Sequence, residues 1–154
     1  MLLLFTDLFL FLNPLRTMPS KVYKIFYDPQ SQTVMMDWDG YSTSQQLYLG
    51  SEEALKLIAK HNAPKLLADL KDMVLLSRED QNWIVNSFIP RAMTAGLEFL
   101  AIVQPVSYFN KIAVDALSFK ANERNLSCKI LQNLELSKQW LENPNEQNSG
   151  TLKT

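Results

Sequence analysis

The chain of 154 residues contains one cysteine and one histidine. Cys128 cannot form an internal disulfide alone, which fits a reducing compartment. Together with His61 it supplies too few ligands for the Cys/His sets that hold structural zinc within one chain. We therefore expect no metal site and no disulfide framework. Because Cys128 lies in a strand-like apolar run, we interpret it as a small core residue rather than a reactive thiol.

The sequence also lacks an excess of charge of either sign. It has 15 Lys and Arg residues against 16 Asp and Glu residues, a formal net charge of −1. Nucleic-acid binding usually needs a basic surface, so we expect no nucleic-acid partner. With 47% hydrophobic and 20% charged residues, the composition is that of an ordinary soluble domain. We expect one cytoplasmic domain.

Motifs that carry catalysis are missing as well. The chain has four glycines, with neither a glycine-rich phosphate loop nor a Gly-x-Ser-x-Gly elbow. His61, the single histidine, ends an expected amphipathic helix, where we interpret it as a solvated residue near the negative end of the helix dipole. We therefore expect no enzymatic activity and no cofactor.

One apolar run stands apart from the rest of the sequence, from Met1 to Leu12. It is a poor signal peptide, since no basic residue precedes it, and it is shorter than the roughly 20 residues of a membrane span. Three interpretations stay open for residues 1–17: an extension upstream of a true start at Met18, a membrane-associating anchor, or a helix packed on the domain or on a partner. Residues 18–142 form the expected domain, and residues 143–154 an expected disordered tail.

Within the domain, short apolar runs alternate with stretches of helical period. This alternation predicts an α/β domain in the order β-β-α-β-α-β-α-β-α, with a mixed, mostly parallel sheet covered by helices. We expect strands at residues 22–28, 32–38, 65–70, 97–103 and 127–131, and helices starting near residues 43, 77, 107 and 133.

Local sequence signals indicate where the first two helices begin, bend and end. Residues 43–46 fit a capping box, and Gly50 either weakens that first helix or lets another group approach its backbone. Pro90 should kink or break the second helix, and Gly96 is placed to end it.

Two further helices have apolar residues at helical spacing. In the third helix we expect an inner face that consists of Phe109, Ile112, Ala113, Ala116 and Leu117. In the last helix we expect Trp140 and Leu141 to point inward.

Several short motifs lie near the ends of the expected strands and helices: Trp38-Asp39-Gly40, Asp69-Leu70-Lys71-Asp72-Met73, Glu79-Asp80-Gln81-Asn82-Trp83, Ala95-Gly96-Leu97 and Trp140-Leu141. With them, residues 21–142 resemble the STAS-like domains typified by bacterial anti-sigma factor antagonists. The resemblance is greater to divergent bacterial STAS-like proteins with a Trp-x-Gly turn after the second strand. It implies a regulatory, protein-binding module, whose partner is another protein or a second copy of the chain.

The best-understood STAS domains are switched by phosphorylation of a serine in an Asp-Ser-x-Gly motif after the third strand. Here the segment has neither serine nor glycine. Ser77 is the nearest hydroxyl, and we interpret it as a helix N-cap rather than a phosphoacceptor. The expected interaction patch consists of Asp69, Lys71, Asp72, Met73 and Ser77.

Two alternatives compete with this interpretation. Asp69 and Asp72 lie at the carboxyl end of a strand, where α/β sheets place their ligands. Such a carboxylate pair could bind magnesium and Lys71 could bind a phosphate, but two carboxylates supply too few ligands alone. The stronger alternative is a carrier or sensor of an apolar small molecule or lipid. Its adaptable pocket would be lined by Met35, Met36, Met73, Met93, Trp83, Phe88 and Tyr108. A membrane contact is expected only if residues 1–17 are native.

Overall fold

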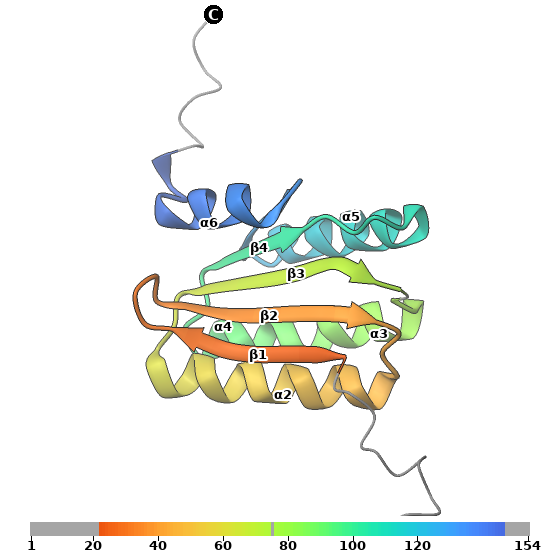
Figure 1. Ribbon diagram of the computed structural model, residues 1–154. Coiled ribbons are helices and arrows are strands. Elements are labelled where there is room, and N and C mark those ends of the chain that lie inside the picture. The colour runs from red at the N-terminus through yellow and green to blue at the C-terminus, as the bar shows by residue number, and fades with distance from the viewer. Residues whose placement is uncertain (1–21, 75, 147–154) are drawn as a thin grey trace, which may run out of the picture.

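The computed structural model describes residues 22–74 and 76–146 (Figure 1). The expected N-terminal extension, residues 1–17, lies outside these residues, and so does most of the expected tail, residues 147–154. Residues 143–146 of the tail are described, and Pro144 among them is buried. The chain therefore still contacts the folded domain just beyond the boundary expected at residue 142.

Five strands of the described residues form one mixed sheet in the order β1-β2-β3-β4-β5. β1 runs antiparallel to β2, and each later pair is parallel, as the arrowheads of β1, β2 and β3 in Figure 1 show. The α/β class and the expected hairpin at the start of the domain are confirmed. The strands are β1 Tyr23–Asp28, β2 Thr33–Gly40, β3 Lys65–Met73, β4 Phe99–Val103 and β5 Ser127–Leu131.

The helical segments follow the expected order, but the second connection is built from three consecutive pieces. The segments are α2 Ser44–His61, α3 Arg78–Trp83, η2 Ile84–Phe88, α4 Ile89–Thr94, α5 Tyr108–Glu123 and α6 Leu134–Glu142.

Pro90 distorts this second connection, as expected, without breaking it. The π-helical turn η2 precedes the proline, and the backbone N–H of Ile89 donates to the carbonyl of Ile84, five residues back. The wider turn makes room where a proline ring would crowd the preceding turn of an α-helix. Gly96, at a φ of 120°, follows the end of α4 as expected.

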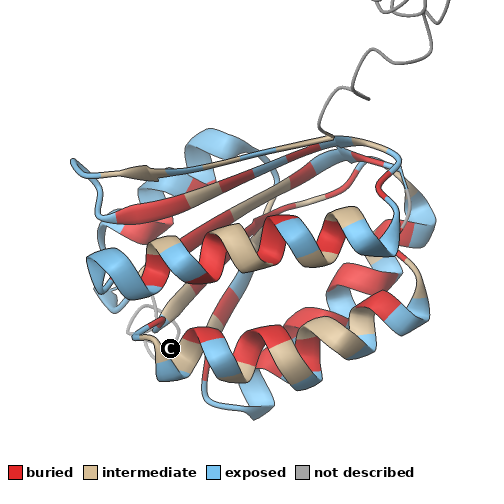
Figure 2. Ribbon diagram, turned by 90° about the horizontal axis from the view of Figure 1, so that it is seen from below, coloured by how far each residue is buried: buried red, intermediate tan, exposed pale blue. Residues whose placement is uncertain are grey.

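The two faces of the sheet are covered unequally. α2, the α3–η2–α4 connection and α5 pack around the main core on one face, whereas α6 packs on the other face, mainly against β3, β4 and β5. Trp140 and Leu141 of α6 are buried there, as expected. Phe26 of β1 lies on the α6 side and is 40% exposed. Figure 2 shows buried and exposed positions alternating along the helices, as expected for helices covered on one side.

The orientation of α5 differs from the expectation. Ala113 and Leu117 are buried as expected, but Phe109 is 78% exposed, Ile112 is 53% exposed and Ala116 is also exposed. Apolar residues occur all around this helix, so their spacing does not single out one face. The face turned to the core consists of Asn110, Ala113, Val114, Leu117, Ser118 and Ala121.

α2 begins with the expected capping box and packs closely on β2. The Thr43 hydroxyl accepts a hydrogen bond from the Gln46 backbone N–H at 3.2 Å, and the Gln46 side chain accepts one from the Thr43 N–H at 3.0 Å. A Cβ atom at position 50 would lie 2.7 Å from the Cη2 atom of the Trp38 ring. Gly50 therefore permits a close approach of helix and sheet. This was one of the two roles expected for Gly50 from the sequence.

Gly50→Ala should lower the free energy of unfolding by about 1–3 kcal/mol, because the added methyl group overpacks against the buried Trp38 ring. Without that contact, alanine would stabilise a helix interior by roughly 0.5–1 kcal/mol relative to glycine. Urea denaturation measures the difference. Gln45→Ala, at an exposed position of the same helix, is the control and should change stability by less than about 0.5 kcal/mol. A more stable Gly50→Ala protein would contradict the packing argument.

Candidate interaction surface

β3 continues three residues beyond the end expected from the sequence. We expected it to end at Leu70, and it ends at Met73. Its pairing with β4 stops at Asp69, whereas its pairing with β2 continues to Met73 past a register shift. Asp72, expected in the segment after the strand, therefore lies in the sheet, because the additional pairing with β2 holds it there.

Four aspartates meet at this end of the sheet, on the face away from the main core. Asp37 and Asp39 come from β2, and Asp69 and Asp72 come from β3, with Asp37 paired to Asp69 and Asp39 paired to Asp72. Sequence reasoning named only the two on β3. The alternation of Asp37 and Asp39 with apolar neighbours was the signal for the other two, but the pairing of β2 with β3 was needed to bring the four together.

The charges of the other three aspartates act on Asp37. Partial burial is the largest cause that raises the pKa of Asp37, followed by the charges of Asp69, Asp39 and Asp72, while Lys24 lowers it. Within residues 22–74 and 76–146, no group of three or more His, Cys, Asp or Glu side chains is placed to hold a metal ion.

A buried asparagine fixes the segment that follows β3. Asn110 of α5 is 2% exposed. Its Nδ2 donates to the Met73 carbonyl at 2.7 Å, and its Oδ1 accepts from the Leu76 N–H at 3.1 Å. Both ends of the amide thus satisfy backbone groups on either side of residue 75. Sequence reasoning missed Asn110, although a polar residue among the apolar residues of a helix start was a visible signal.

Large apolar side chains are exposed in the loops that follow three neighbouring strands. Tyr41 after β2 is 59% exposed, Val74 after β3 is 56% exposed and Val106 after β4 is 68% exposed. Lys71 and Asp72 are exposed beside them. We call these five residues the carboxyl edge, because the parallel strands end here.

Backbone hydrogen bonds tie the loops of the carboxyl edge to one another. The Val74 N–H donates to the Gly40 carbonyl at 3.0 Å, and the Val106 N–H donates to the Lys71 carbonyl at 3.1 Å. These bonds join the ends of β2, β3 and β4 beyond the regular ladder. The exposed side chains therefore stand on a backbone that is held in place.

The residues of the expected interaction patch differ in their exposure to solvent. Lys71 and Asp72 are exposed and Asp69 is half-buried, whereas Met73 is 4% exposed and belongs to the main core. Ser77 is the N-cap of α3, as expected, and its Oγ accepts a hydrogen bond from the Asp80 N–H at 3.1 Å.

Cys128 is buried in β5, as expected for a small core residue. Burial raises the pKa of its thiol to about 11, and a hydrogen bond with Ser118 acts weakly in the opposite direction. The reactive thiolate form is therefore scarce near neutral pH.

The main core leaves little space for an apolar ligand. The pocket lined by Met36, Trp38, Met73 and Phe88, among others, has a volume of about 60 Å³. Tyr108, also expected to line such a pocket, is 70% exposed.

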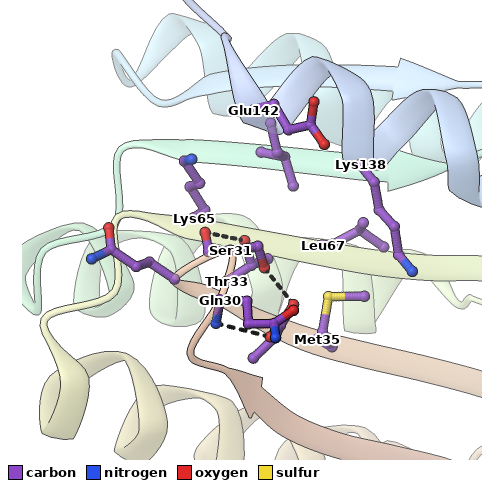
Figure 3. A pocket seen from close by; sticks show the side chains of 11 residues that line it. Gln30, Ser31, Thr33, Met35, Lys65, Leu67, Lys138 and Glu142 are labelled. Atoms are coloured by element: carbon purple, nitrogen blue, oxygen red, sulfur yellow. Dashed lines mark hydrogen bonds between the residues drawn. The ribbon is translucent and has the colours of Figure 1, made fainter.

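Met35 lies on the other face of the sheet, in a hollow of about 480 Å³ beside α6. Figure 3 shows Lys138 reaching from α6 toward Met35 and Leu67, with the polar residues Gln30 and Ser31 of the hairpin nearby. The methionines expected to form one pocket are therefore divided between the two faces of the sheet.

In comparisons with known protein families and with curated proteins, no family model and no protein matches the chain. Among the described helices, none combines the length and the apolar composition that a membrane crossing requires.

Asn110→Ala should lower the free energy of unfolding by about 1–3 kcal/mol, because it leaves a buried carbonyl and a buried N–H without partners. Urea denaturation measures the loss, and hydrogen exchange at the Leu76 amide should accelerate more than exchange in β1. Asn82→Ala, at an exposed position of α3, is the control. Unchanged exchange at Leu76 would show that Asn110 does not hold this segment.

Asp37→Asn should raise the melting temperature at pH 7. Since the pKa of Asp37 is raised in the folded chain, folding disfavours its ionised form, and stability falls as the pH rises from the unfolded pKa through the folded one. Asparagine avoids that loss. Its advantage should disappear near pH 3, where the aspartate is mostly protonated in both states. Melting curves at the two pH values measure the effect.

Asp28 supplies a control of opposite sign. A hydrogen bond from the Ser31 side chain is the largest cause that lowers the pKa of Asp28. Its ionised form therefore contributes stability above the unfolded pKa, and this stability is lost as the pH falls through the folded pKa. Asp28→Asn should lower the melting temperature at pH 7. A change of the same sign for both variants would contradict the electrostatic assignment.

Proposed function

We propose that the chain is a non-enzymatic regulatory or protein-interaction module of STAS-like type that binds a protein partner through its carboxyl edge. The observation that supports this most directly is the exposure of Tyr41, Val74 and Val106 on three adjacent loops. Exposed apolar side chains gathered in one place are typical of protein-binding surfaces. The element order and the motifs at its joints support the STAS-like assignment, for which we expect a cytoplasmic location.

The rigidity of the carboxyl edge favours binding. The Val74 and Val106 N–H groups each donate a hydrogen bond, and the Asn110 side chain donates one and accepts one, so the loops are held before any partner binds. A surface that is already ordered loses less conformational entropy on association.

Charge indicates which partners suit this surface. Asp72 of the carboxyl edge belongs to the cluster of four aspartates, which outnumber Lys71 of the edge and the nearby Lys24, so negative charge predominates beside the apolar side chains. A partner with an apolar contact surface flanked by Lys or Arg is complementary to it. We therefore expect binding to weaken as the salt concentration rises.

The carrier alternative receives less support. A site for a drug-sized ligand usually has a volume of roughly 300 Å³ or more. The hollow beside α6, about 480 Å³, has this volume, but Asp28, Lys65, Lys138 and Glu142 are among its lining residues, so it does not suit an apolar ligand. The apolar pocket in the main core has about 60 Å³. Binding a lipid there would require the core to open, whereas binding a protein at the carboxyl edge requires no such change.

Val106→Asp should abolish capture of a specific protein partner, because it places a charge within the apolar contact. Affinity purification of the tagged full chain, quantified by mass spectrometry, compares this variant with the unchanged chain. Leu49→Asp is the control, since Leu49 is 53% exposed on α2 and is not one of the residues of the carboxyl edge. A partner retained by Leu49→Asp and lost by Val106→Asp supports the proposal. Equal capture by all three chains, or co-purification of a lipid in place of a protein, contradicts it.

A further inference from the structure

The outer face of α5 carries an apolar stripe that nothing in the described fold covers. Tyr108, Phe109, Ile112 and Phe119 are 70%, 78%, 53% and 66% exposed, and Ala116 between them is also exposed. Their spacing of three, four and seven residues places them on one side of the helix. This side is opposite the residues of α5 that pack on the core. We call these five residues the α5 stripe.

We propose that two copies of this chain pair through the α5 stripe, with the two α5 helices antiparallel about a two-fold axis. This pairing is separate from the proposed binding of a partner at the carboxyl edge, because it uses different residues. Three observations support it: the area of the stripe, its internal symmetry and the charges beside it.

The area suits a protein interface. The exposed parts of the three aromatic rings and of Ile112 amount to on the order of 500 Å². A standard interface takes roughly 800 Å² from each partner, a little over half of it apolar. The α5 stripe can therefore supply the apolar centre of such an interface, and the polar residues around it the rim.

The stripe is complementary to a reversed copy of itself. With the two-fold axis between residues 113 and 114, Tyr108 lies opposite the partner's Phe119. Ile112 lies within one residue's rise, about 1.5 Å, of the partner's Ala116. The large side chains then meet at both ends, and the small Ala116 leaves room for Ile112 in the middle. Two-fold interfaces require this kind of self-complementarity.

The same register matches charges of opposite sign. Lys111 and Asp115 lie along one flank of the α5 stripe, and Asp115 is exposed. In the antiparallel pair, Lys111 comes beside the partner's Asp115, and the symmetry repeats this contact. Each contact is a rim ion pair that contributes more to specificity than to affinity.

A groove adjoins the stripe on the side of α3. It has a volume of about 510 Å³, and its lining includes Arg78 of α3 and Phe109, Ile112 and Lys120 of α5. Side chains of a second α5 can enter it, since helices that cross at a shallow angle pack ridges into grooves. The competing occupants are a foreign amphipathic helix and the apolar residues 1–12 of this chain, and a monomeric protein would indicate one of these instead.

Sedimentation velocity of the full chain tests the pairing directly. We expect a concentration-dependent dimer, and a monomer at all concentrations up to about 100 µM overturns the proposal. Ile112→Asp should weaken dimerisation at least tenfold. Leu49→Asp is the matched control, because Leu49 and Ile112 are both 53% exposed, and it should leave the dimer unchanged. Equal weakening by both variants also overturns the proposal.

A charge exchange tests the register and does not depend on stability. Lys111→Asp and Asp115→Lys should each weaken self-association several-fold, because each places like charges beside one another at both symmetric contacts. An equimolar mixture of the two variant chains should form a heterodimer, because every contact across the axis then joins opposite charges. Native mass spectrometry of chains that differ in mass measures this preference. A statistical mixture of dimers contradicts the antiparallel register.

Discussion

The carboxyl edge depends on β3 remaining in the sheet after it has left β4. Pairing with β4 stops at Asp69, but the ladder with β2 continues to Met73. The additional residues present the Lys71 carbonyl to Val106 and the Met73 carbonyl to Asn110. Without this extension, the loops after β2, β3 and β4 would lose the backbone groups that join them. One strand pairing thus determines both the acidic cluster and the exposed apolar residues next to it.

Much of the fold follows from local signals in the sequence. The capping box at Thr43, the N-cap at Ser77 and the tight packing at Gly50 all depend on residues close in sequence or on simple size limits. The end of β3 does not follow from local signals, because the charged residues Lys71 and Asp72 are typical of a turn. They remain in a strand since only one neighbouring strand continues beside them, a property of sheet register that no local pattern contains.

The orientation of α5 could not be predicted for a different reason. Leu117 of the inner face and Phe119 of the outer face have similar apolar character, so periodicity fits both faces. The inner face is selected by small residues that let α5 approach the sheet, and by Asn110, whose amide has backbone partners only on that side. The side chains left outside form the α5 stripe. The apolar residues that make the inner face ambiguous in the sequence are therefore the same residues that form the proposed interface.

The two proposed surfaces are linked through α5. Val106 of the carboxyl edge lies two residues before α5 begins, so each edge lies near the N-terminus of that helix. An antiparallel pair places the two N-termini at opposite ends, separated by roughly 20 Å at 1.5 Å per residue. The dimer would then present two carboxyl edges that point apart and do not block each other. A partner that is itself dimeric, or clustered, would bind such a pair more tightly than one copy, since the second contact forms at a high effective concentration.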